Sequence, residues 1–196
     1  MIFDEVVTGF RLSYDGAQEY YGVTPDLSSV GKIMGGGYPL ADVVGRGDIL
    51  SVYDPESAGS DGYVNQIGTL NGNPVACAAE LATLAELRKE GVYERVRETG
   101  SKVRKPLVDI CTQNGIAVQM CGEDAIFDLY FTNRPVTSYR DGLSADTGMM
   151  NRFNTGLLER GILKGGQKYY PSAVHTEEDV ERTIQAIAEV VPGLKE

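Results

Sequence analysis

The chain has 196 residues, 42% of them hydrophobic, and a formal net charge of −10, which is long enough for one or two domains with a buried core. The acidic balance argues against non-specific binding to nucleic acid, which needs a basic face, and three cysteines beside a single histidine argue against a disulfide framework or a zinc site. No apolar run approaches the ~20 residues of a membrane span and no signal peptide is recognisable, so we expect no membrane association and a cytoplasmic location.

The first third of the chain alternates short apolar runs with glycine-rich turns, a rhythm typical of an α/β layer. We expect strands at about 1–7, 27–31 and 41–45, short helices near 16–22 and 47–53, and a polar loop over 54–72. Because the first strand starts without a lead-in, we expect that sequence upstream of Met1 is missing.

The pattern of the remaining sequence predicts longer helices and a change from an α/β layer to an α+β arrangement. Asn73 is placed to cap a helix with Pro74 in its first turn, and Gly91 should end that helix before a second one that runs to about Asn114. Further along we expect strands at 116–122 and 125–132, a helix near 144–160, short strands around 161–171 and a last helix from Thr176. This pattern indicates a smaller α+β domain.

Lys32 follows the short apolar run LSSVG and precedes three consecutive glycines, Gly35 to Gly37. Burying an ammonium without a partner is costly, but a partly buried lysine has a lowered pKa and becomes a nucleophile. Such lysines form Schiff bases with carbonyl groups, including that of pyridoxal phosphate (PLP). The glycines would then let the backbone pass close to a flat cofactor. The alternative is a lysine that extends from a strand end beside a flexible turn.

Asp4 lies at the end of the first expected strand, in IFDE. PLP needs a carboxylate at its pyridine nitrogen, and a buried Asp4 would gain a cationic partner there. On a strand Glu5 should point the opposite way and be structural, whereas Val6 returns to the Asp4 face and could pack against the ring. The alternative for Asp4 is an ordinary acid at a strand end.

Thr69 lies in GTLNGNP, a glycine-flanked turn just before a helix. Its hydroxyl and the exposed backbone N–H groups of such a turn suit a phosphate. The alternative is a plain turn that leads into the Asn73 cap.

Together, IFDEVVTGFR, GVTPDLSSVGKIMGGGYPLADVVGR and GTLNGNP resemble the class III (subgroup II) PLP-dependent aminotransferases, in particular the glutamate-1-semialdehyde 2,1-aminomutase-like branch. The order of the motifs and the interval from Asp4 to Lys32 both fit. The resemblance covers essentially the whole chain, weakly through 100–160, and returns in LLERGIL and SAVHTEEDVERTI.

The resemblance implies an α/β fold, the PLP-dependent transferase fold type I. Residues 1–90 would be the C-terminal half of the PLP-binding large domain, and 91–196 the small α+β C-terminal domain. The implied activity is amino-group transfer between a small-molecule amino donor and a keto acceptor, or 1,2-amino migration, which would make the enzyme an isomerase.

The resemblance also implies a role for each matching residue. Lys32 would bond to PLP and later move a proton between substrate and cofactor carbons. Asp4 would pair with the pyridine nitrogen, and Val6 would pack on one ring face. Thr69, with the backbone of Gly68, would bind the phosphate of a PLP held mainly by the other subunit of a homodimer with shared active sites.

Two departures from the family pattern bear on function. The family has much more sequence before the aspartate, so the alternative is an incomplete, non-catalytic half-enzyme or a subunit that needs an N-terminal partner. The family also tends to have small residues where Asp42 and Val44 stand. Asp42 could lie near the cofactor and alter substrate choice, or face away from it.

Overall fold

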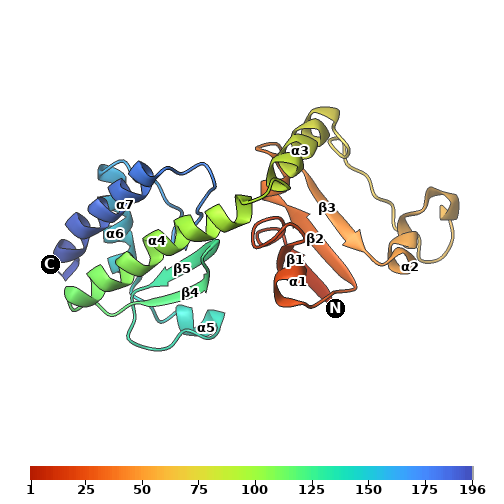
Figure 1. Cartoon of the computed structure of the whole chain (residues 1–196). Helices are drawn as coiled ribbons and strands as arrows, with labels where there is room; N and C mark the ends of the chain where they lie inside the picture. The colour runs from red at the N-terminus through yellow and green to blue at the C-terminus, as the bar shows by residue number, and fades with distance from the viewer. Residues whose placement is uncertain (196) are drawn as a thin grey trace. The chain divides into compact units, whose positions relative to one another are not determined.

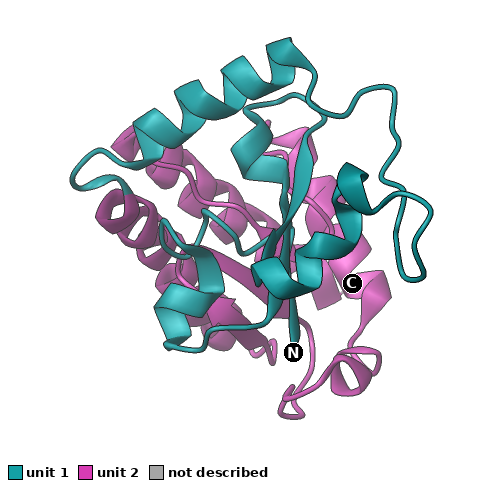
Figure 2. Ribbon diagram, turned by 90° about the vertical axis from the view of Figure 1, so that its right-hand side faces the viewer, with its two compact units in different colours: residues 1–92 teal, residues 93–196 magenta. Residues whose placement is uncertain are grey.

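The computed structural model describes residues 1–195. The chain divides into two compact units, residues 1–92 and residues 93–196, which are coloured separately in Figure 2. Each unit has a sheet and helices of its own, so the expected α/β composition is confirmed.

Unit 1 is built on a three-stranded sheet in the order β1-β2-β3 (Figure 1). Its strands are β1 (Ile2–Glu5), β2 (Leu27–Gly31) and β3 (Ala41–Gly45). β1 runs parallel to β2, and β3 runs antiparallel to it. The second and third strands match the expectation. The first is shorter than the expected 1–7, because the chain turns after Glu5, where the N–H of Gly9 donates to the Glu5 carbonyl at 2.8 Å.

The helices of unit 1 are short except for the last one. They are α1 (Gly16–Tyr21), η1 (Lys32–Gly35), α2 (Gly47–Leu50), η2 (Ser51–Tyr53), η3 (Pro55–Ser57) and α3 (Pro74–Leu87). The predicted cap of α3 is confirmed, since Asn73 Oδ1 accepts from the N–H groups of Val75 at 3.0 Å and Ala76 at 3.2 Å. The expected loop over 54–72 contains one short 3₁₀ turn, η3.

Unit 2 has an antiparallel sheet in the order β4-β5-β6 and three long helices. The elements are α4 (Val92–Gln113), β4 (Gln119–Glu123), β5 (Ile126–Tyr130), α5 (Tyr139–Gly142), α6 (Thr147–Glu159), β6 (Lys168–Tyr169), α7 (Glu177–Val190) and η4 (Val191–Lys195). Of the strands expected over 161–171, this segment forms only β6. The favourable start predicted at Thr176 is confirmed, since Thr176 and Asp179 form a capping box.

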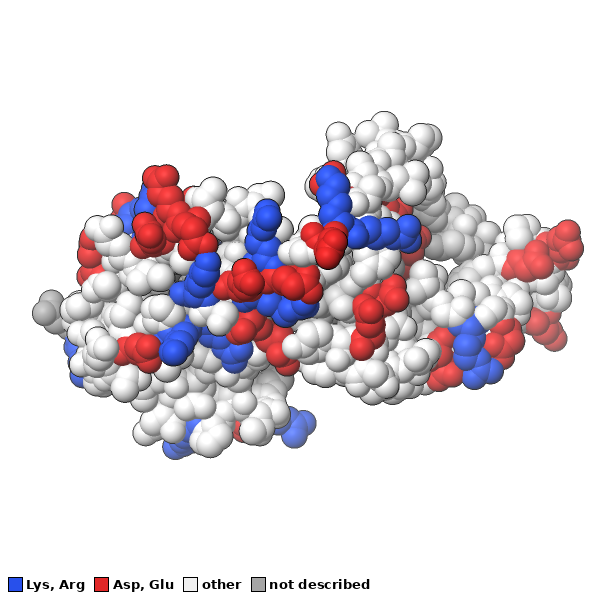
Figure 3. Space-filling model, viewed as in Figure 1, with Lys and Arg blue, Asp and Glu red and all other residues white. Residues whose placement is uncertain are grey.

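The core of unit 2 joins its long helices to β5. Eight of its side chains are at most 1% exposed, namely Leu107, Cys111, Phe127, Leu129, Phe153, Leu157, Ile187 and Val191. No helix within residues 1–195 is long and apolar enough to cross a membrane. Lys and Arg lie interspersed with Asp and Glu on the face drawn in Figure 3.

The glycine-rich turn that follows Lys32 packs against α3. Gly36 has a φ of +58°, and a Cβ there would lie 2.9 Å from the carbonyl oxygen of Ala79 and would overlap the hydroxyl of Thr83. Glycine at this position therefore permits both the left-handed backbone and the close approach of the turn to the helix.

We expect Gly36→Ala to lower the free energy of unfolding by about 1–3 kcal/mol, because it adds a clash to a strained backbone. Gly37→Ala is the matched control, since Gly37 also has a positive φ, +92°, but its Cβ would meet nothing within 4 Å. Urea unfolding of the two variants measures the difference. Equal losses would mean that the contact with α3 contributes nothing.

Candidate functional site

Three of the predicted site residues lie at one edge of the sheet of unit 1. Asp4 pairs with Ser29 across the parallel β1–β2 ladder, and Lys32 follows directly after β2 ends at Gly31. A Cβ on Gly31 would lie 3.7 Å from Cγ1 of Val6, so Val6 packs beside the strand end that leads into Lys32. The carboxyl ends of parallel strands meet at the same edge of a sheet, where open α/β sheets bind their ligands.

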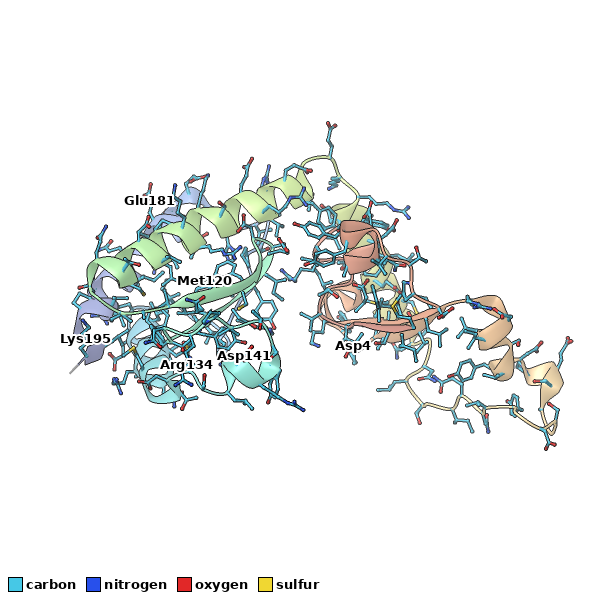
Figure 4. The ribbon with its side chains drawn as sticks, turned by 90° about the horizontal axis from the view of Figure 1, so that it is seen from below. Asp4, Met120, Arg134, Asp141, Glu181 and Lys195 are labelled. Carbon is cyan, nitrogen blue, oxygen red and sulfur yellow. The ribbon has the colours of Figure 1, made fainter. Side chains whose placement is uncertain are left out.

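In the described part of the chain, only one oxygen of the Asp4 carboxylate accepts hydrogen bonds from the protein (Asp4 is labelled in Figure 4). Its Oδ1 accepts from the N–H of Val6 at 3.1 Å and lies 3.5 Å from the hydroxyl of Ser29. Within residues 1–195, no hydrogen bond reaches Oδ2. One oxygen is thus fixed by the protein while the other is available to a donor.

Lys32 stands in a strained conformation, with a φ of +52°. Non-glycine residues rarely adopt this left-handed region, and such strain clusters at functional sites. Its ammonium makes no hydrogen bond or ion pair within the part of the chain that the structure describes.

The expected burial of Asp4 and Lys32 is wrong. Both residues are exposed. Asp4 lies on the sheet face that carries the exposed side chains of Ile2 and Val43, whose exposed fractions are 71% and 51%, and Lys32 lies beyond the end of β2. The opposite face carries Glu5, which is 1% exposed. The expected separation of Glu5 from the Asp4 face is therefore confirmed.

For Gly36, one of the three glycines expected to lie near a cofactor, the structure shows a different neighbour. The close approach that Gly36 permits is to α3, since its Cβ would meet Ala79 and Thr83. A cofactor is not required to explain Gly36.

Gly68 and Thr69 lie in a turn in which the N–H of Asn71 donates to the Gly68 carbonyl at 3.0 Å. Both are exposed. Within residues 1–195, no hydrogen bond or ion pair joins either of them to Asp4 or Lys32. The structure of this chain does not bring the turn together with the pair.

Asp42 faces away from the Asp4 side of the sheet. It pairs with Val30, whereas Ser29, the partner of Asp4, pairs with Val43. Burial raises the pKa of Glu80 on α3, and the nearby Asp42 carboxylate adds to the rise. Of the two alternatives for Asp42, the structure thus supports the one that keeps it away from Asp4.

Sequence reasoning missed a second unusual lysine, Lys164 in unit 2. It lines a pocket of about 610 Å³ between α4, α7 and residues 161–171. Its Nζ donates to Asn154 Oδ1 at 2.8 Å and to the carbonyl oxygens of Gly165 and Gly166, and burial lowers its pKa to about 8. Three acceptors hold this ammonium in place, which is the pattern of a structural lysine. Within residues 1–195, no group of three or more potential metal ligands is present.

Comparisons with known proteins agree with this geometry. Residues 1–191 match the family described as "Aminotransferase class-III". The glutamate-1-semialdehyde 2,1-aminomutase of Methanothermobacter thermautotrophicus is 41% identical, over 100% of this chain and 46% of that protein. The chain spans less than half the length of the curated relatives it matches, between 43% and 46%.

Solved structures of transaminases share the fold of this chain, and two of them illustrate the match. An omega-transaminase from Sphaerobacter thermophilus superposes with a TM-score of 0.90 at 30% identity, over 100% of this chain and 44% of that one. A structure described as a transaminase with PLP bound gives 0.84 at 26% identity, over 98% and 44%. The fold expected from the sequence motifs is confirmed, and the chain belongs to the class III aminotransferase family.

Proposed function

We propose that this chain is part of a PLP-dependent enzyme that moves an amino group, either from a small-molecule amino donor to a keto acceptor or between adjacent carbons of one substrate. The observation that carries the proposal is the placement of Asp4, Val6 and Lys32 at the carboxyl-terminal edge of β1 and β2. Family membership supports the same chemistry, because the related proteins are named aminomutases and transaminases.

The donor set fits PLP. When bound, PLP supplies an electron sink, since its protonated pyridine ring accepts the electron pair of the reacting substrate carbon. Asp4 would accept a hydrogen bond from the protonated pyridine nitrogen at Oδ2, the oxygen that the protein leaves free, while Oδ1 would keep the N–H of Val6. An ionised carboxylate keeps that proton in place by charge.

Lys32 and Val6 would contact other parts of the cofactor than Asp4 does. The Nζ of Lys32 makes no hydrogen bond or ion pair within the described residues, so it could condense with the cofactor aldehyde with loss of water. Once the substrate amine has displaced it, the free amine of Lys32 could carry a proton as a base. The side chain of Val6 would pack against the ring and hold it flat. The strained backbone of Lys32 fixes where its long side chain begins.

Gly68 and Thr69 would bind a cofactor phosphate in a homodimer. Their separation from the Asp4 and Lys32 pair within one chain agrees with a turn that serves the active site of the other subunit. The exposed hydroxyl of Thr69 and the turn's N–H groups are suited to an anion. A cytoplasmic location stays a prediction.

The alternative function is that of a half-enzyme that needs an N-terminal partner. The specific observation in its favour is that the curated relatives are more than twice as long as the matched region. The exposed apolar residue Ile2 on the edge strand β1 would then be covered by the partner.

We predict that PLP is carried on Lys32. Borohydride reduction of the assembly that contains this chain and PLP, followed by peptide mass mapping, should find the cofactor on Lys32. Lys32→Ala should abolish the attachment and lower turnover by roughly 10³-fold, the range for losing a positioned base. Lys164, with its lowered pKa, is the rival amine, so a label on Lys164 would contradict the prediction.

We predict that Asp4→Asn leaves PLP attached but lowers turnover by roughly 100-fold or more, because a neutral amide cannot stabilise the charged ring. Steady-state kinetics and the visible spectrum of the bound cofactor measure the two effects. Asp42→Asn is the matched control, since Asp42 belongs to the same sheet but to its other face. Near-normal turnover of the Asp4 variant would rule out the proposed role.

We predict that residues 1–196 alone bind PLP weakly and do not transfer amino groups, whereas co-expression with the N-terminal half of a class III relative restores both. Absorbance of the bound cofactor and an amino-transfer assay compare the two preparations. If the chain alone binds PLP tightly and is active, the half-enzyme alternative is wrong.

A further inference from the structure

Glu5 is a buried acid at the end of β1, with an exposed fraction of 1%. Its Oε2 accepts from the hydroxyl of Thr8 at 2.8 Å and from the N–H of Ala17 at 2.8 Å, and its Oε1 accepts from the N–H of Gln18 at 3.0 Å. The two amides open α1 and have no partner inside the helix. The carboxylate thereby ties the end of β1 to its own turn and to α1.

The space around Glu5 is closed on two sides. Gly16 has a φ of +79°, and a Cβ there would lie 2.6 Å from Oε2 of Glu5. A Cβ on Gly9 would lie 2.7 Å from the Glu5 carbonyl oxygen, which also accepts the N–H of Gly9 at 2.8 Å. Both the main chain and the side chain of Glu5 are therefore fixed.

Asp4 and Val6, the two residues proposed to contact the cofactor, flank Glu5 in the chain. Because side chains alternate along a strand, the side chain of Glu5 lies on one face of the sheet and those of its two neighbours are directed to the other face. The hydrogen bond from the N–H of Val6 to Asp4 Oδ1, at 3.1 Å, connects the two residues on either side of Glu5. If the hydrogen bonds of Glu5 are lost, the end of β1 becomes more mobile, and the orientation of the Asp4 carboxylate is then less well defined.

We infer that Glu5 is a positioning residue for the cofactor site: its buried carboxylate holds the β1 end so that Asp4 keeps Oδ2 directed at its ligand and Val6 keeps its place beside Gly31. The inference rests on the proposed role of Asp4 and adds the residue that enforces it. Outer partners that orient metal ligands change affinity or activity by about 10–100-fold when they are removed, and we expect an effect of similar size here.

The test uses Glu5→Gln in the PLP-binding assembly. The variant keeps the shape but turns an amide NH₂ toward backbone donors, so the bonds to α1 weaken. We expect PLP affinity and turnover to fall roughly 10-fold or more. Glu19→Gln is the matched control, since Glu19 lies in α1 beside Ala17 and Gln18, is exposed, and binds only nearby groups of Ser13 and Asp15.

A double-mutant cycle separates positioning from general stability. If Glu5 acts through Asp4, Glu5→Gln should cost less than about twofold in turnover and PLP affinity when Asp4 is already Asn. An equal fold-loss in both backgrounds would overturn the inference while leaving the role of Asp4 intact. If Asp4→Asn alone has no effect, the proposed function fails, and the inference fails with it.

A readout without cofactor completes the test. In PLP-free protein, Glu5→Gln should speed hydrogen exchange of the Ala17 and Gln18 amides, and Glu19→Gln should not. Unchanged exchange would overturn the inference. Should Glu5→Gln fail to fold, Thr8→Val removes one of the three donors and keeps the carboxylate. It should then give a smaller loss with the same dependence on Asp4, and an additive loss would overturn the inference.

Discussion

The parallel pairing of β1 with β2 is the constraint on which the site depends. It sets Asp4 opposite Ser29 and brings the ends of both strands to one edge of the sheet. A slip of the register by one residue would turn Asp4 to the face that Glu5 occupies and bury the wrong acid. The chemistry proposed for this edge requires that the carboxylate and the lysine approach from neighbouring strands, and the parallel ladder provides that arrangement.

Different contacts fix the ends of β1 and β2. On β1 the buried carboxylate of Glu5 binds the first amides of α1, and the N–H of Val6 holds Asp4 Oδ1. On β2 the chain enters a 3₁₀ turn at Lys32 and closes onto α3 at Gly36. Glu5 lies on the opposite face of the sheet from Asp4, so the Asp4 carboxylate stays exposed while the backbone that carries it is fixed.

The sequence predicted those features whose signals are local. The strands at 27–31 and 41–45, the Asn73 cap and the start at Thr176 follow from a few adjacent residues, and all four appear in the structure. The short motifs also indicated the face shared by Asp4 and Val6, because strand alternation is a local rule.

Features that depend on distant partners escaped prediction. The exposure of Asp4 and Lys32 depends on what packs over the sheet, and the role of Gly36 depends on α3, which lies far along the chain. The partners of Glu5 come from α1, and no motif marks them. The held ammonium of Lys164 likewise requires Asn154 on another element. Tertiary contacts decide these properties, and periodicity does not report them.

The most direct measurement of the central claim is a crystal structure of the PLP-loaded assembly that contains this chain. The account predicts continuous density between Lys32 Nζ and the cofactor, with Oδ2 of Asp4 at hydrogen-bond distance, about 3 Å, from the pyridine nitrogen. A cofactor attached to another lysine, or a pyridine nitrogen that faces a group other than Asp4, would contradict it.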